Sequence, residues 1–212
     1  MKSRAQEIKE DTSLLAADYR DGMAHVKVPI PTARYMNDLF RLRCAPGLLA
    51  TGYYPNAKEF SESSGAYRAA VRHLPAIDLD DRGVIALVVG DGNTPRTGAM
   101  FAFRSAWTAV SVDPRLKTEK TDVQRLYPIK AKIEEAEDLR EWVGASAVVV
   151  VAVHSHASLP AAVERAKALS GHVACIAMPC CVRQDLAVAP DGQYEDWGVL
   201  SPKRTIKVWR RL

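Results

Sequence analysis

The chain has 212 residues, of which 48% are hydrophobic and 25% are charged, and this composition is typical of a globular domain with a sizeable core. The formal net charge is +4, which permits an anionic partner without requiring one. No stretch reaches the ~18 apolar residues of a membrane helix, and the charged start of the chain, Met1–Asp11, lacks the apolar core of a secretion signal. We therefore expect no membrane segment.

The cysteines show neither a CxxC spacing nor the spacing of a Cys/His zinc finger. They are Cys44, Cys175, Cys180 and Cys181. Such a pattern favours reduced thiols in a cytoplasmic protein and predicts no metal site.

Residues 1–83 are predicted to form an N-terminal layer, separate from a second domain at 84–212. The expected elements are a helix capped by Thr12 through about Arg20, a short strand over His25–Val28, a helix over Ala33–Leu42 capped by Thr32, and a helix over Ala57–Leu74 interrupted at Ser63–Gly65. The layer either packs on a sheet edge or recognises a substrate. Its tyrosines and arginines could stack bases and contact phosphates, although packing is the commoner use of a single aromatic ring.

The centre of the chain shows a strand, a glycine turn, a helix and a second strand in succession. Val84–Val89 is continuously apolar, as in a strand buried on both faces. The turn Gly90-Asp91-Gly92 follows, then a predicted helix over Thr97–Arg104 and a strand over Ala109–Val112, which ends at Asp113. This order is typical of a nucleotide-binding βαβ unit.

The glycine turn lets the backbone approach a ligand closely, and the acid 21 positions beyond Gly92 suits the two hydroxyls of a ribose. A third fingerprint glycine is missing, Pro95-Arg96 adds bulk where a pyrophosphate would rest, and no phosphate-binding P-loop is present. An adenosine without phosphate, as in S-adenosylmethionine (SAM), therefore fits better than NAD. Similar turns also occur in α/β proteins that bind no nucleotide. The predicted cofactor residues of this unit are Gly90, Asp91, Gly92, Asn93, Thr94 and Asp113.

The alternation of helices and strands continues after Asp113. We expect a helix over Lys117–Leu126, a third strand over Ile129–Ile133 and a helix over Glu137–Val143. Glu134 and Glu135 come just past that strand, so one of them could accept a hydrogen bond from the adenine amino group.

Further strands are predicted over Ser146–Val153, His172–Met178, part of 187–200 and Thr205–Trp209, with a helix over Leu159–Leu169 capped by Ser158. The predicted fold is α/β, an open Rossmann-like doubly wound sheet of the class I methyltransferase type with an N-terminal helical layer.

Several of these motifs together resemble class I SAM-dependent methyltransferases. They are Gly90-Asp91-Gly92, Asp113, Ala152–Leu159 and Met178-Pro-Cys-Cys181. The resemblance covers about residues 84–182 and is strongest to a branch with a His-x-Cys-Gly motif after the fourth strand and a double cysteine after the fifth, which includes a transfer-RNA 2′-O-methyltransferase family. Here His156-Ala157 replaces Cys-Gly. The resemblance implies methyl transfer to an oxygen or nitrogen acceptor, with RNA favoured and a small molecule as the competing class.

His154 and His156 are the predicted catalytic residues, because a neutral imidazole at the tip of a buried strand could take a proton from a hydroxyl or amine. One of them could instead satisfy backbone groups of the turn. Cys180 and Cys181 are better explained as wall residues than as nucleophiles. Two other functions stay open: a nicotinamide-dependent Rossmann oxidoreductase, and a non-catalytic SAM-fold scaffold that binds RNA.

Overall fold

The computed structural model describes residues 17–20, 23–26, 32–180 and 185–212, and the chain divides into two compact units, Met1–Pro31 and Thr32–Leu212. In the first unit, strand β1 (Ala17–Arg20) pairs antiparallel with β2 (Met23–Val26). The helix predicted to run through Arg20 is therefore wrong over 17–20, and its cap Thr12 lies outside the described residues. Asp21-Gly22, the pair between the two strands in the sequence, is a strong hairpin signal, and it explains the difference.

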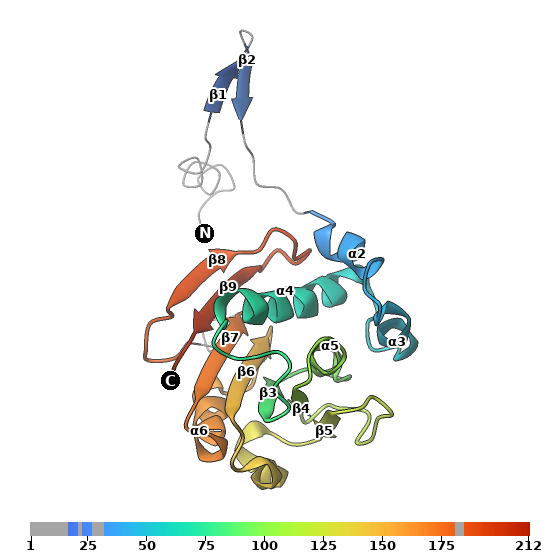
Figure 1. Ribbon diagram of the computed structural model, residues 1–212, viewed down its shortest axis with the longest axis vertical. Helices are drawn as coiled ribbons and strands as arrows, with labels where there is room; N and C mark the ends of the chain where they lie inside the picture. The colour runs from blue at the N-terminus through green and yellow to red at the C-terminus, as the bar shows by residue number, and fades with distance from the viewer. Residues whose placement is uncertain (1–16, 21–22, 27–31, 181–184) are drawn as a thin grey trace. The chain divides into compact units, whose positions relative to one another are not determined.

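A single seven-stranded sheet, in the order β5-β4-β3-β6-β7-β9-β8, organises the described part of the second unit (Figure 1). Its strands are β3 (Val84–Val89), β4 (Thr108–Val112), β5 (Leu126–Ile129), β6 (Ala147–Val153), β7 (Val173–Met178), β8 (Gly192–Glu195) and β9 (Thr205–Trp209). The strands from β3 to β7 pair in parallel, whereas β9 is antiparallel to both of its neighbours. The parallel pairing of β3 with β4, which the βαβ pattern predicts, is confirmed.

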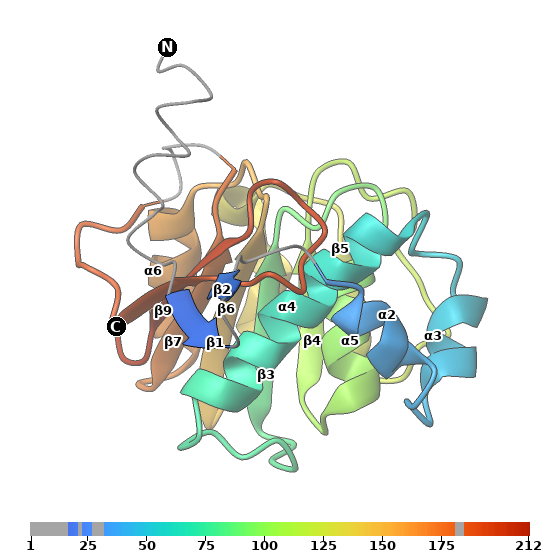
Figure 2. The same cartoon turned by 90° about the horizontal axis from the view of Figure 1, so that it is seen from above.

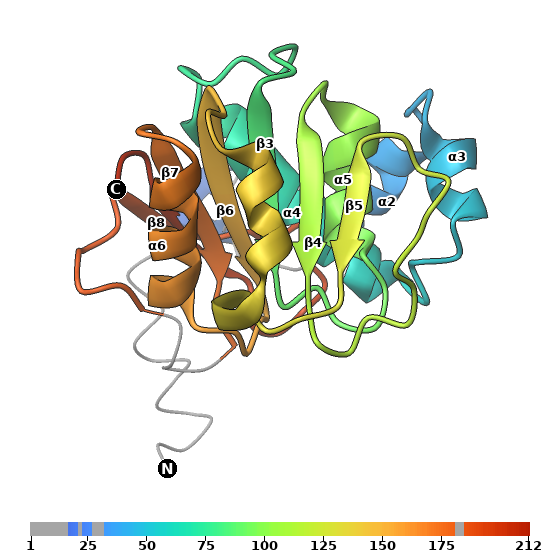
Figure 3. The ribbon, with the colours of Figure 1, turned by 90° about the horizontal axis from the view of Figure 1, so that it is seen from below.

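Helices cover both faces of this sheet. Val84, Ala86 and Val88 belong to the core under α4 (Ala57–His73) and α5 (Arg96–Arg104). The alternate residues of β3 belong to the second core, under α6 (Leu159–Leu169) (Figures 2 and 3). Two short helices, α2 (Arg34–Leu39) and α3 (Ala45–Ala50), complete the layer beside α4 and α5. The predicted doubly wound sheet with a helical layer is confirmed.

Helix α4 is continuous, so the predicted interruption at Ser63–Gly65 is wrong. All three of these residues are buried, and a Cβ on Gly65 would lie 2.7 Å from Cγ2 of Val199. The small residues therefore let the helix pack closely rather than break it. The predicted cap of α2 is also wrong, because its N-cap residue is Ala33 and not Thr32.

The connection from β4 to β5 is a loop, not the predicted helix over Lys117–Leu126. Thr121 Oγ1 accepts a hydrogen bond from the backbone N–H of Val123, a local side-chain contact that competes with helix formation. Strand β5 accordingly begins at Leu126, earlier than predicted. The 3₁₀-helices η2 (Ile133–Glu135) and η3 (Glu137–Trp142) follow it.

The predicted boundary between residues 83 and 84 differs from the division after Pro31, because α2, α3 and α4 lie in the same compact unit as the sheet. That residues 1–83 act as a functional layer stays a prediction. Across the ranges described above, no helix has the length and apolar character needed to cross a bilayer.

Candidate functional site

The glycine loop after β3 adopts a backbone that favours glycine. Gly90 has φ +68° and Gly92 has φ +85°, in the left-handed region. A Cβ on Gly90 would lie only 2.0 Å from Oγ of Ser155, just beyond the end of β6. The loop after β3 and the loop after β6 are therefore in direct contact, and the contact leaves no room for a side chain at Gly90.

Asp91 holds the glycine loop to the start of α5. Its carboxylate accepts hydrogen bonds from the backbone N–H groups of Thr97 and Gly98, both at 3.0 Å, and from Oγ of Ser111 at 2.8 Å. Burial raises the pKa of this carboxyl, although the donors act in the opposite direction. The predicted contact of Asp91 with a cofactor stays a prediction, since all three bonds go to the protein itself.

Asp113 joins the end of β4 to the same loop. One carboxylate oxygen accepts from the backbone N–H of Gly92 at 2.8 Å, and the other accepts from the backbone N–H of Arg115 at 2.7 Å. The residue is 3% exposed. A carboxylate has about four acceptor positions, so both oxygens can accept further bonds from a ligand.

A cavity of about 320 Å³ opens at the carboxyl ends of the central strands. Gly90, Asp113 and Glu134 line it, and Val112 and Ile133 supply apolar wall. His156, Lys132 and Arg115 also line it. The structure thus brings together residues that follow β3, β4, β5 and β6, in a mixed polar and apolar pocket of the kind that binds small ligands.

Five of the predicted cofactor residues lie outside the lining of this cavity, namely Asp91, Gly92, Asn93, Thr94 and Glu135. Thr94 donates its hydroxyl to the carbonyl of Tyr53 at 3.2 Å, and the carbonyl of Asn93 accepts from the N–H of Lys117 at 3.0 Å. Glu135 is exposed and lies 3.3 Å from Lys132 Nζ. Their role in ligand binding stays a prediction.

His154 lies at the end of β6 and contacts a residue that the sequence did not single out. Its Nε2 is 3.0 Å from Oε1 of Glu62 in α4. The backbone of His154 is in the left-handed region, with φ +47°, which is uncommon outside glycine and recurs at functional sites. Both ring nitrogens are buried, and neither makes a hydrogen bond with the residues that the structure describes, so the contact with Glu62 is a close approach of the two groups.

Glu62 is a buried carboxylate between Lys58 and His154. It is 3% exposed, and Lys58 Nζ approaches its Oε1 at 2.8 Å. Burial alone would raise the pKa of Glu62, but the contacts with His154 and Lys58 outweigh it and lower the pKa below its ordinary value. One turn earlier, Glu59 pairs with Arg96 at 2.6 Å. The first turns of α4 thus contact both the end of β6 and the start of α5.

His156 and Cys180 lie beside each other on the same edge of the sheet. His156 Nε2 is 3.8 Å from Sγ of Cys180, and that thiol also approaches the carbonyl of His154 at 3.7 Å. Cys181 lies outside the described residues. Within the described part of the chain, no three His, Cys, Asp or Glu side chains are grouped to hold a metal ion.

Comparison with known proteins places the chain by fold rather than by sequence. No protein-family model matches it, and no curated protein matches its sequence. Among solved structures, MtNAS in complex with MTA and tNA is similar with a TM-score of 0.50 and 11% identity, over 85% of this chain and 69% of that chain.

Two further similar structures are a methylase and a methyltransferase by name. An rRNA methylase from Streptococcus thermophilus has a TM-score of 0.41 and 14% identity, over 75% of this chain and 99% of its own. The MycE methyltransferase of the mycinamycin biosynthetic pathway, in complex with Mg and SAH, has a TM-score of 0.41 and 11% identity, over 92% of this chain and 62% of its own. At such identities a likeness shows the fold alone, and the one to MtNAS shows that this chain has a Rossmann-like α/β sheet.

Proposed function

We propose that the protein is a SAM-dependent methyltransferase that transfers a methyl group to an oxygen or nitrogen acceptor. The observation that carries this proposal is the cavity of about 320 Å³ between Gly90 and Asp113. In open α/β sheets, ligands bind outside the carboxyl ends of the strands, where the strand order reverses. Here that point is β3, whose neighbours are β4 and β6.

The residues of the cavity fit an adenosine. The buried carboxylate of Asp113 keeps acceptor capacity for two ribose hydroxyls, beyond the two backbone bonds it already accepts. Glu134 would accept from the adenine amino group, and Val112 and Ile133 would contact the ring faces. SAM, when bound, supplies a methyl group on a positively charged sulfur.

A dinucleotide fits this site less well. A pyrophosphate binds to the free backbone N–H groups at the start of a helix, but those of Thr97 and Gly98 already donate to Asp91. A phosphate there would also meet the carboxylate of Asp91 at close range. We therefore favour SAM over NAD, and methyl transfer over hydride transfer.

Both predicted histidines remain part of the proposal. His154 and His156 follow β6, and His156 lines the cavity itself. Methyl transfer needs in-line positioning of the acceptor, and a base only when the acceptor is a weak nucleophile. An imidazole at this edge of the sheet could take the proton of a hydroxyl or amine.

The proposal has two finer parts, the class of the methyl acceptor and the relationship of this chain to one branch of methyltransferases. The resemblance to the branch that includes a transfer-RNA 2′-O-methyltransferase family favours RNA, and so does the net charge of +4. A small-molecule acceptor is the competing class, and a scaffold that binds SAM without turnover is the non-enzymatic alternative. A cytoplasmic location is proposed on the cysteine pattern alone.

Calorimetry with SAM, its demethylated product and NAD tests the cofactor. We expect the first two to bind and NAD not to bind. NAD binding in preference to SAM would favour the oxidoreductase instead. Incubation with labelled SAM and fractionated cell extract then tests the acceptor, because label on RNA is removed by nuclease. Label confined to small molecules would reject RNA, and tight SAM binding with no label transfer would favour the scaffold.

A further inference from the structure

We propose that Glu62 positions the imidazole of His154, and that this imidazole takes the proton that the substrate loses when it is methylated. This inference rests on the proposed function and adds to it the side chain that fixes the imidazole. The juxtaposition on which it depends is the 3.0 Å approach of Glu62 Oε1 to His154 Nε2.

The fold brings this pair together from separate layers. Glu62 belongs to α4, in the helical layer, whereas His154 follows β6, in the centre of the sheet. The adjoining contact between Ser63 Oγ and Thr97 Oγ1, at 3.1 Å, places the same turn of α4 over the start of α5. The pair therefore lies at the edge of the sheet where the glycine loop also lies.

The backbone of His154 is held on both sides. Its N–H donates to the carbonyl of Met178 at 2.9 Å, and its own carbonyl lies 3.7 Å from the thiol of Cys180. These contacts hold the left-handed conformation with φ +47°. A strained conformation persists only where the surrounding structure fixes it, and such residues cluster at functional sites.

The charges around the pair suit a proton acceptor. Lys58 keeps a positive charge 2.8 Å from Glu62, so the carboxylate remains ionised while it faces the imidazole. With Nε2 turned toward this carboxylate, the proton of neutral His154 belongs on Nε2, and Nδ1 is left as the base. Neither ring nitrogen makes a hydrogen bond with the described side chains and backbone, so this assignment rests on the 3.0 Å approach of Nε2 to Glu62.

The proton balance of the transfer follows from this arrangement. A lone pair on the acceptor oxygen or nitrogen forms the bond to the methyl carbon, and the electrons of the broken carbon–sulfur bond stay on sulfur. The proton that the acceptor loses goes to Nδ1 of His154. Glu62 keeps its own charge throughout and stabilises the imidazolium that forms, so it is a positioning residue and not a proton carrier.

The test compares three variants of the full-length protein. E62Q keeps the size of the side chain and removes its charge, and E62M also removes the acceptor. E164Q is the matched control, because Glu164 is likewise a helical glutamate paired with a lysine, at 3.3 Å from Lys167, but lies on α6. SAM binding is measured by calorimetry, methyl transfer by label uptake as a function of pH, and the tautomer of His154 by ¹⁵N NMR of the imidazole.

We expect E62Q to bind SAM within about twofold of wild type but to transfer label on the order of 100-fold more slowly, with an altered pH profile, since general-base catalysis contributes roughly 10²- to 10⁴-fold. The wild-type NMR spectrum should show the proton on Nε2, and E62M should show a mixture of tautomers. E164Q should match wild type in all three measurements.

Two results would overturn the inference: wild-type transfer by E62Q, or a wild-type spectrum with the proton on Nδ1. Failure of the wild-type protein to bind SAM would reject the proposed function instead. The NMR comparison would still decide whether Glu62 fixes the imidazole, because it needs neither cofactor nor acceptor. The two failures are therefore distinguishable.

Discussion

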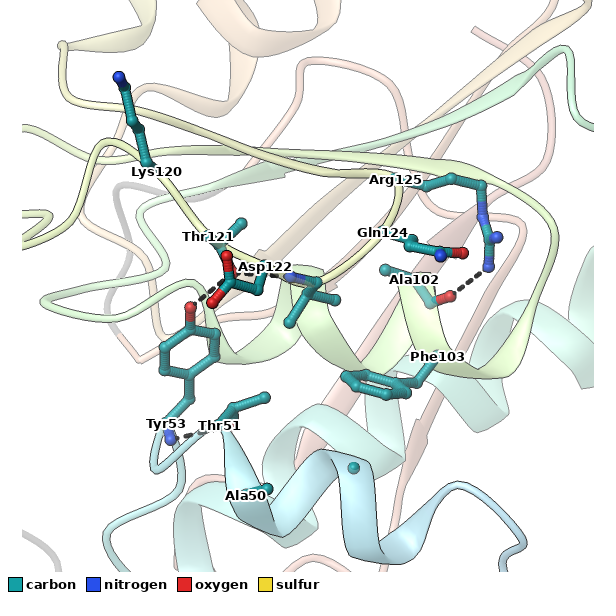
Figure 4. A pocket seen from close by; sticks show the side chains of 12 residues that line it. Ala50, Thr51, Tyr53, Ala102, Phe103, Lys120, Thr121, Asp122, Gln124 and Arg125 are labelled. Carbon is teal, nitrogen blue, oxygen red and sulfur yellow. Dashed lines mark hydrogen bonds between the residues drawn. The ribbon is translucent and has the colours of Figure 1, made fainter.

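Two cavities in the described part of the chain differ in size and in character. The larger, of about 570 Å³, lies between α3, α5 and the loop before β5 (Figure 4). The smaller, of about 320 Å³, lies at the carboxyl ends of the central strands. The larger cavity is lined by side chains from a peripheral helix and a connecting loop, whereas strand ends from the middle of the sheet converge on the smaller one.

Several polar groups of the larger cavity have structural partners. Figure 4 shows Tyr53 joined to Thr121 by a hydrogen bond between their hydroxyls, at 2.8 Å. Arg125 donates to the carbonyls of Ala102 and Ser105, at 2.7 and 3.0 Å, and so satisfies the end of α5. In the smaller cavity, Asp113 keeps acceptor capacity for a ligand. The convergence of strand ends and the unused capacity of a buried acid therefore favour the smaller cavity as the proposed cofactor site, although it has the smaller volume.

The largest effect that separates the two regions is expected for Gly90→Ala. A Cβ there combines a left-handed φ of +68° with a 2.0 Å approach to Ser155, so the free energy of unfolding should fall by about 2–5 kcal/mol. SAM binding should be lost with it. Thermal unfolding and calorimetry measure both effects.

The matched control is Gly52→Ala, next to the larger cavity. Gly52 has φ +65° and nothing within 4 Å of an added Cβ, so this variant should show only the backbone cost of about 1–2 kcal/mol and keep its affinity for SAM. Equal losses of stability in the two variants would mean that the contact of Gly90 with Ser155 does not constrain the loop.

Asp113→Ala should come next, as an effect on binding. Loss of a buried acceptor of two hydroxyls costs about 1–3 kcal/mol, or roughly 5- to 150-fold in the affinity for SAM. Asp122→Ala removes the corresponding charge from the larger cavity and should leave that affinity unchanged. Calorimetry on both variants decides which cavity holds the cofactor, and a loss confined to Asp122→Ala would reverse our assignment.

Thr121→Val is expected to produce a smaller effect, on stability alone. The variant removes the hydroxyl that bonds to Tyr53 across the larger cavity and accepts from the N–H of Val123, and each such hydrogen bond contributes about 0.5–1.5 kcal/mol. Chemical denaturation should show this loss while SAM affinity stays at the wild-type value. A loss of affinity would show that the larger cavity contributes to cofactor binding.

The smallest effect should appear in the dependence of stability on pH. The pKa of Glu62 is lowered in the folded protein by His154 and Lys58, so its stabilising contribution is present above the ordinary value of 4.5. This contribution is lost as pH falls through the folded-state pKa. E62Q cannot titrate and should therefore lose less stability between neutral and acid pH than wild type. The same dependence of the free energy of unfolding on pH in wild type and E62Q would contradict this expectation.

The strands of the sheet could be predicted because strands that are buried on both faces are continuously apolar in sequence. The unbroken apolar runs at Val84–Val89 and Ala147–Val153 become its two central strands. The polar segment after Asp113 has no apolar run of this kind. Side-chain hydrogen bonds, such as the one that Thr121 accepts from the N–H of Val123, fix a loop there. At Ser63–Gly65, small residues that usually weaken a helix instead allow close packing, which depends on a partner that is distant in the sequence.

The candidate site could be predicted only in part. Gly92 and Asp113 follow strands that pair, so the hydrogen bond between them follows from the βαβ pattern. The contact of Glu62 with His154 joins α4 to a strand that is not its neighbour in the chain, and no periodicity encodes it. The one available signal was an acid among small residues of a helix, Ser61–Gly65, where a solvated charge is not expected.

The place of β9 in the sheet has a consequence for how the chain folds. β9 covers the outer edge of β7, pairing Ile176 with Val208, and the two strands are separated by the whole of residues 179–204. Until residues 205–209 have been synthesised, the apolar strand Val173–Met178 has an open edge, which is a template for pairing with other chains. Nascent chains that stop short of β9 should therefore be the aggregation-prone and chaperone-dependent form of this protein.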